Sequence, residues 1–183
     1  MKNKKSNIFN KNQKNNKQIV YKYDPFIKVY RENFNNKYLT RNNFHNIKIQ
    51  DAAMVMLEND KNEILFLNEY RRGLKKMSLG LPGGHIEKNE KPISTIKREL
   101  LEETGHYATS WKLLLKYTMH GTYELGKDYF FTAKLVEKNT NNKSENIQKK
   151  WLNKKKMLYM LNNKKFETAG IIAAVSYYLL FKK

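Results

Sequence analysis

Cysteine is absent from the 183-residue sequence. Its absence excludes a disulfide framework, a thiolate metal site and a cysteine nucleophile. It fits a reducing compartment, so we expect a cytoplasmic protein. Long apolar runs are also lacking: GIIAAVSYYLLF near the end is apolar for only twelve residues and is bracketed by charge. A bilayer-spanning helix needs roughly 20 such residues. We therefore expect no membrane contact and interpret this run as a helix that packs on the core.

Acidic residues are scarce, with 17 against 36 basic residues and a net charge of +19. Such a surface attracts anions in general, including nucleotides, nucleic acid and acidic lipid. The lysines, however, are spread along the chain together with asparagines, as in NKNQKNNK and KNTNNK. Interleaved aromatic residues, which nucleic-acid sites favour, are not concentrated in these runs. The charge therefore reads as a compositional bias, and nucleic acid is not the partner that we favour.

The length suits one domain with a substantial core. Residues 1–18 are polar, acid-free and of low complexity, without the apolar run of a secretory signal, and we predict a disordered tail there. Residues 19–46 alternate apolar and polar residues and predict a small β-sheet with a turn near Asp24-Pro25. Residues 47–183 form the main domain. Its predicted strands cover residues 51–57, 63–70, 111–119, 127–136 and 147–152, and its later helices cover residues 154–161 and 166–183.

The most informative stretch covers residues 79–106. Pro92 suits the first turn of a helix and Gly105 suits the left-handed position just past a helix end, so a helix is predicted between them. One side of this helix would face a core and carries Ile93, Ile96 and Leu100. Another side is acidic, with side chains at i, i+3 and i+4 that meet: Glu99, Glu102 and Glu103.

Like charges at this spacing destabilise an isolated helix, and a divalent cation would reverse that cost. Hard cations such as Mg²⁺ take carboxylate oxygens and keep waters and substrate phosphates as their remaining ligands. The alternative is a solvated acidic face, as in most glutamate clusters. The loop Pro82-Gly83-Gly84 ahead of the helix favours a site, because two glycines let the backbone approach a metal or a pyrophosphate.

The stretch resembles the signature of the Nudix hydrolases: Gly, five residues, Glu, seven residues, Arg-Glu, an aliphatic residue, any residue, Glu-Glu, any residue, Gly and an aliphatic residue. The matching positions are Gly84, Glu90, Arg98, Glu99, Leu100, Glu102, Glu103 and Gly105. His106 departs from the pattern, since an aliphatic residue is usual there. The resemblance implies an α/β (α+β) fold, in which a mixed β-sheet is sandwiched between α-helices, here with an added N-terminal antiparallel sheet.

The resemblance also implies hydrolysis of a nucleoside diphosphate linked to another moiety, with Mg²⁺ or in its place Mn²⁺ as the cofactor. The expected metal ligands are the Gly83 carbonyl, Glu99, Glu102 and Glu103. Glu90 is expected to support these ligands without being a direct ligand itself. Arg98 would orient the glutamates by ion pairing. Glu145, which matches a glutamate ahead of a Trp-containing strand in many relatives, would be the general base; the alternative is a single acid in a basic surface loop. We thus expect Glu145, Glu102 and Arg98 to be catalytic.

Weaker segments bear on the substrate. Tyr70, Arg71 and Arg72 end a predicted strand ahead of the loop, similar to relatives that act on ADP-ribose, in which these residues lie near the substrate. An arginine can bind a phosphate with a bidentate fork, so these three residues and Gly84 are expected substrate contacts; the alternative is ordinary surface arginines. The segment Met119-His120-Gly121 keeps the glycine but lacks the proline of the Ser-Pro-Gly element that ADP-ribose hydrolases commonly carry.

The resemblance thus predicts a pyrophosphatase acting on ADP-ribose or a related nucleoside diphosphate sugar, with AMP and ribose 5-phosphate as products. In such relatives an N-terminal sheet often contributes to a dimer, so a homodimer is expected; the alternative is a simple edge hairpin. Two other functions stay open: an RNA 5′ pyrophosphohydrolase of the decapping type, and a non-catalytic nucleotide-binding module. The complete set of signature carboxylates argues against the second.

Overall fold

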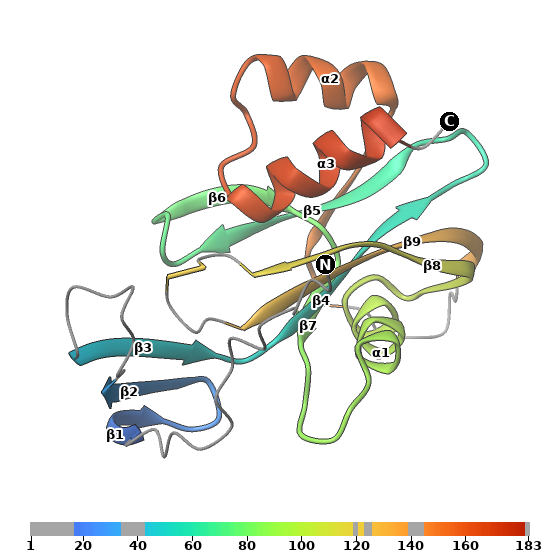
Figure 1. Ribbon diagram of the computed structural model, residues 1–183. Helices are drawn as coiled ribbons and strands as arrows, with labels where there is room; N and C mark the ends of the chain where they lie inside the picture. The colour runs from blue at the N-terminus through green and yellow to red at the C-terminus, as the bar shows by residue number, and fades with distance from the viewer. Residues whose placement is uncertain (1–16, 34–42, 119–120, 123–125, 139–144, 182–183) are drawn as a thin grey trace, which may run out of the picture. The chain divides into compact units, whose positions relative to one another are not determined.

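The computed structural model describes residues 17–33, 43–118, 121–122, 126–138 and 145–181. Most of the predicted tail and the Met119-His120 pair lie outside these residues. The chain divides into two compact units, residues 1–49 with 122–124, and residues 50–121 with 125–183. Figure 1 shows the fold of each unit.

The first unit is an antiparallel sheet of three strands, in the order β1 (Lys17–Tyr23), β2 (Ile27–Asn33) and β3 (Asn43–Ile49). The predicted N-terminal antiparallel sheet is thus confirmed. Its described interior is polar: Glu32 and Asn46 are its buried side chains, and Asn46 Nδ2 donates to Glu32 Oε2 at 2.6 Å. The apolar side chains of this sheet are largely exposed.

The second unit holds a mixed sheet in the order β10-β5-β4-β9-β8, with β6 paired to β5 and β7 paired to β4. Only the β4–β9 pairing is parallel among the described strands. The strands are β4 (Ala52–Glu58), β5 (Ile64–Arg71), β6 (Lys76–Gly80), β7 (Gly83–His85), β8 (His106–Thr118), β9 (Lys127–Lys138) and β10 (Gln148–Leu152). The helices are α1 (Pro92–Thr104), α2 (Lys154–Asn162) and α3 (Ala169–Phe181).

Helices cover both faces of this sheet, α1 on one and the pair α2 and α3 on the other (Figure 1). Alternation along β4 supplies both cores: Val55 packs in the α1 core with Ile96 and Leu100, and Met56 packs in the opposite core with Tyr178. The sandwich predicted from the sequence is therefore confirmed. Among the residues that the structure describes, no helix has the length and apolar character needed to cross a membrane.

Several predicted boundaries were wrong. The strand expected at residue 111 begins at His106, because the chain leaves α1 through Gly105, at φ 70°, directly into β8. The glycine-rich segment expected as a loop contains β7, and its lead-in contains β6. Strand β7 has three residues and pairs with β4, and β6 has five residues and pairs with β5, so neither is long enough to give a clear pattern in the sequence. The last helix begins at Ala169 instead of residue 166.

Candidate functional site

Two glycines of β7 bring the backbone against the acidic side of α1. Gly83 has a φ of 156°, and a Cβ atom there would lie 2.3 Å from the Ala53 carbonyl oxygen, so glycine is required by both conformation and space. A Cβ atom on Gly84 would lie 2.3 Å from Glu99 Oε1. The Gly84 backbone therefore borders the Glu99 carboxylate directly.

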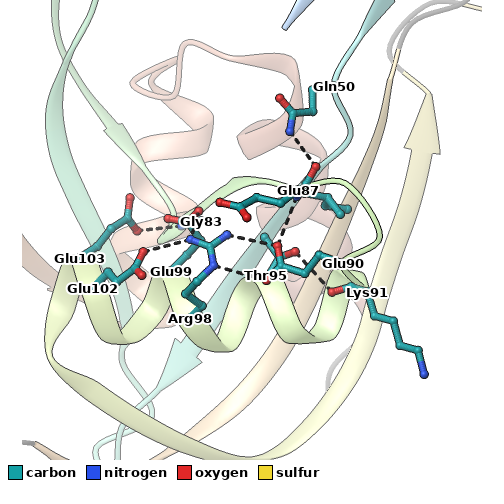
Figure 2. Close-up of polar contacts among 11 residues, drawn as sticks. Gln50, Gly83, Glu87, Glu90, Lys91, Thr95, Arg98, Glu99, Glu102 and Glu103 are labelled. Atoms are coloured by element: carbon teal, nitrogen blue, oxygen red, sulfur yellow. Dashed lines mark hydrogen bonds and ion pairs between the residues drawn. The ribbon is translucent and has the colours of Figure 1, made fainter. Parts of the chain in front are cut away.

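Helix α1 places its glutamates by burying its other side. Ile96 and Leu100 are buried against the sheet and Ile93 packs at the edge of the same core, as the spacing predicted. The helix begins at Pro92, and the Gly105 N–H donates to the Leu101 carbonyl at 2.9 Å to end it. With that side fixed, Glu103 reaches Gly83 of β7 and Glu99 borders Gly84, while Glu102 lies beside Arg98 (Figure 2).

Arg98 binds three carboxylates at once (Figure 2). Its Nε and Nη2 atoms donate to the two Glu90 oxygens at 3.3 and 3.2 Å. Its Nη1 atom donates to Glu99 Oε1 and to Glu102 Oε2, each at 3.0 Å. The hydrogen bond from Arg98 lowers the pKa of Glu90 from 4.5 to about 2, and the same bond raises the pKa of Arg98. Arg98 thus holds Glu90, Glu99 and Glu102 as one network.

Glu103 lies apart from that network. Its Oε2 atom accepts the Gly83 N–H at 2.9 Å, and no described lysine or arginine forms an ion pair with it. Burial raises the pKa of Glu103 from 4.5 to about 8, and the charges of Glu69, Glu99 and Glu145 add to the rise. Burial also raises the pKa of Glu99, although Arg98 opposes it. A cation at this place would relieve an uncompensated carboxylate.

Glu145 reaches the same place from the segment before β10. Its backbone N–H donates to the Glu102 carbonyl at 3.2 Å. Its side chain is exposed, and its charge is among those that raise the pKa of Glu103. The structure therefore brings Glu145 close to the glutamates of α1.

Tyr70, Arg71 and Arg72, at the end of β5, differ in their surroundings. Arg71 lines a pocket of about 260 Å³ and its Nη2 atom pairs with Glu69 Oε2 at 2.8 Å. Tyr70 is 60% exposed and Arg72 is also exposed, and neither lines this pocket. The pocket is lined by Ala52, Met54, Arg71, Leu79, Gly80, Leu81, Gly83, Gly84, His85, Thr168 and Ile171. Of the four predicted substrate contacts, Arg71 and Gly84 line this pocket, and Tyr70 and Arg72 do not.

Sequence reasoning missed Glu69, and two other titratable side chains lie in this region. Glu69 stands two residues before Arg71, so strand periodicity alone places both on one face. His85 lies on β7 opposite Ala52 and lines the pocket. The Glu167 carboxylate pairs with Lys76 of β6.

The donors at this site suit a hard divalent cation, because carboxylate and carbonyl oxygens are its preferred ligands. Within the described residues, no three His, Cys, Asp or Glu side chains already converge as a cation site. Arg98 engages one oxygen each of Glu99 and Glu102, and each keeps its second oxygen. The residues therefore fit a metal by donor type.

Comparison with known proteins places the chain in a family. Residues 48–174 match the model of the NUDIX domain, which is more than half of the chain. The chain belongs to the NUDIX family, and the resemblance read from the sequence is confirmed. Nudix hydrolases generally use divalent metal ions, in agreement with the donors described above.

Three relatives illustrate the similarity. The methanol dehydrogenase activator of Bacillus methanolicus is 30% identical over 90 residues, 49% of each chain. The ADP-ribose pyrophosphatase of Bacillus subtilis (strain 168) is 34% identical over 76 residues, 41% of each chain. The chain thus spans about half the length, or less, of these curated relatives. A solved ADP compounds hydrolase has a TM-score of 0.70 at 21% identity, over 90% of this chain and 92% of that one, which shows the fold.

Proposed function

We propose that the protein is a Mg²⁺-dependent pyrophosphohydrolase that cleaves ADP-ribose, or a related nucleoside diphosphate sugar, into AMP and ribose 5-phosphate. The observation that carries the proposal is the Glu103 carboxylate, partly buried, held by the Gly83 N–H and lacking a cationic partner among the described residues. An adjoining pocket with Arg71 at its edge supplies a place for substrate. The names of the Bacillus subtilis relative and of the solved hydrolase support the substrate class.

The site residues would have three roles: binding the cation, accepting a proton and orienting the carboxylates. Glu99, Glu102, Glu103 and the Gly83 carbonyl would hold the cation. When bound, Mg²⁺ neutralises the diphosphate, polarises a P–O bond and lowers the pKa of a coordinated water. Glu145 accepts the proton of the attacking water. Arg98 keeps Glu99 and Glu102 in place through its two 3.0 Å hydrogen bonds.

The pocket suggests how the substrate lies. Gly83 and Gly84 border both the pocket and the glutamates, so a diphosphate along β7 would send one end into the pocket. Met54, Leu81 and Ile171 give the pocket an apolar floor. Arg71 at its edge would donate to a phosphate through the guanidinium fork.

A substrate panel with Mg²⁺ tests this function. The panel contains ADP-ribose, other nucleotide sugars, dinucleoside polyphosphates and 5′-triphosphate RNA, and products are separated by ion-exchange chromatography. We expect AMP and ribose 5-phosphate from ADP-ribose at the highest kcat/KM. Equal rates across the panel, or no turnover of ADP-ribose, would remove this substrate assignment.

An RNA 5′ pyrophosphohydrolase is the second candidate, favoured by the net charge of +19. Binding to RNA that neutralises several phosphates should weaken steeply with salt, whereas a substrate of dinucleotide size should show a shallow dependence. Measuring KM between 50 and about 300 mM KCl for both substrates separates the two candidates.

We also propose a homodimer that uses the first unit. This small sheet exposes several large apolar side chains, Ile19, Val20, Tyr21, Tyr23, Phe26, Ile27 and Ile47, and exposed apolar patches commonly mark interfaces. Sedimentation velocity should give twice the 21.9 kDa of one chain, and Tyr21→Glu should shift the protein toward monomer. A monomer at all concentrations would refute the dimer. Cytoplasmic location stays a prediction from composition.

A further inference from the structure

We propose that Glu69 and Gly80 are positioning residues that hold the guanidinium of Arg71 ready for a phosphate group of the substrate. The inference rests on the proposed function, because it concerns the preparation of the same site. Neither residue belongs to the signature, and neither was expected to take part.

Strand β5 places Glu69 and Arg71 on one face, since side chains two residues apart point the same way. Arg71 Nη2 lies 2.8 Å from Glu69 Oε2, within the range of a charge-assisted hydrogen bond. The Glu69 side chain is only 20% exposed, whereas that of Arg71 is 44% exposed. The carboxylate is the less exposed partner, so the ion pair holds the long and flexible arginine side chain against a more buried group.

Gly80 supplies the surface on which the guanidinium lies. Gly80 lies on β6 opposite Leu67 of β5. Leu67 precedes Arg71 by four residues, so the arginine side chain folds back along its own strand. A Cβ atom on Gly80 would lie 2.3 Å from Arg71 Nη2 and 3.4 Å from its Cζ. The φ of Gly80 is outside the left-handed range, so the backbone there tolerates any residue. A side chain at position 80 would instead displace the Arg71 guanidinium, which is the end of a flexible side chain, from this place.

The guanidinium lies where a diphosphate would pass. Arg71 and Gly80 line the pocket together with Gly83 and Gly84. Glu69 is near enough to Glu103 for its charge to raise that carboxyl's pKa. Arg71 therefore lines the pocket, while its ion-pair partner Glu69 is close to the glutamates. Its guanidinium has five N–H donors, and the ion pair with Glu69 involves one nitrogen, which leaves donors for a phosphate.

Removing Glu69 should change the affinity for a diphosphate, and the direction of that change tests its role. An acidic side chain beside an anion site repels the anion, so its removal should tighten diphosphate binding if Glu69 acts through charge alone. If Glu69 positions Arg71, its removal should weaken binding, because the arginine loses its orientation and must be ordered by the ligand. The two roles thus predict opposite changes.

The experiment measures calorimetric affinity for methylenediphosphonate, a diphosphate that cannot be hydrolysed, in the presence of Mg²⁺. The variants are Glu69→Ala, Glu69→Gln, Gly80→Ala and Arg71→Ala, with Gly73→Ala as the matched control because a Cβ there meets nothing within 4 Å. We expect Glu69→Ala and Gly80→Ala each to weaken binding about tenfold. Glu69→Gln, which keeps an acceptor oxygen, should recover part of the loss, and Gly73→Ala should bind as the wild type does.

Double variants complete the test. In the Arg71→Ala background, Glu69→Ala and Gly80→Ala should cause no further loss of affinity, because the residue that they position is gone. Undiminished effects in that background, or tighter binding by Glu69→Ala alone, would overturn the inference. Urea midpoints confirm that each variant is folded, and Glu69→Gln provides an isosteric change if Gly80→Ala is unstable.

Turnover separates this inference from the proposed function. With ADP-ribose, Gly80→Ala should raise KM more than it lowers kcat. A wild type that binds the diphosphonate through Arg71 but does not turn over ADP-ribose contradicts the proposed function and leaves the positioning role supported. A wild type that hydrolyses ADP-ribose with unchanged KM in Gly80→Ala contradicts the positioning role alone.

Discussion

Replacing Glu103 with glutamine tests whether an uncompensated carboxylate lies at the centre of the site. Glutamine has nearly the same shape, and its carbonyl oxygen can still accept the Gly83 N–H. The change therefore removes a charge while it keeps the hydrogen bond. In the metal-free protein, we expect Glu103→Gln to be more stable than the wild type at high pH.

The magnitude follows from the pKa of Glu103, which burial raises from 4.5 to about 8. At 1.36 kcal/mol per pKa unit, ionising this group in the native state costs up to about 5 kcal/mol relative to the unfolded chain. Below pH 4.5 the carboxyl is protonated in both states and the cost is absent. Between pH 4.5 and 8 only the unfolded state is ionised, so wild-type stability falls as pH rises. Above pH 8 the loss is complete.

Urea unfolding with EDTA, from pH 4 to 9, measures this difference. The stability gained by Glu103→Gln should grow between pH 4.5 and 8 and then level off. Glu102→Gln is the matched control on the same helix. The Glu102 side chain is 53% exposed, so this change removes a charge that is not buried. Adding Mg²⁺ at pH 8 should stabilise the wild type and not the Glu103 variant. A pH-independent difference, or a variant less stable at pH 9, would refute the reasoning.

Three further predictions concern the surroundings. Gly84→Ala places a Cβ atom 2.3 Å from Glu99 Oε1 and should lower steady-state kcat at least tenfold, whereas Gly73→Ala should not; equal activity of both would contradict the close approach. Arg98→Met should destabilise the protein in urea at pH 7, with the difference shrinking as pH falls from 4.5 toward 2, because Glu90 has a pKa of about 2 beside Arg98; a constant difference would argue against this pair. Ile96→Ala removes a fully buried side chain and should cost about 2–5 kcal/mol in urea unfolding, against little for Ile172→Ala at 40% exposure; similar losses would contradict the core.

The sequence predicted the parts of the site that local chemistry determines. Pro92 and Gly105 bound α1 as expected, because a missing N–H and a left-handed backbone are properties of single residues. The helical spacing of Ile96 and Leu100 placed the core side. The remaining helix side then had to carry the glutamates, and the structure has them there.

Other parts depend on neighbours that are distant along the chain. Sequence reasoning left Arg71 and Arg72 equal, whereas in the structure Arg71 lies beside Gly80 of the adjacent strand and lines the pocket, and Arg72 does not. Strand β7 exists because its backbone pairs with β4, about 30 residues earlier, and GGH has no periodicity of its own. His106, in an aliphatic position of the signature, is buried with its ring 6.1 Å from that of Trp151, a partner set by tertiary packing.

The central claim is that the signature glutamates support metal-dependent cleavage of a nucleoside diphosphate. The most direct measurement is the rate of AMP release from ADP-ribose as Mg²⁺ is raised from zero, in the wild type and in Glu103→Gln. We expect a saturable rise with Mg²⁺ in the wild type, and in the folded variant a rate lower by at least a hundredfold. AMP release that is independent of Mg²⁺, or equal in the two proteins, would contradict it.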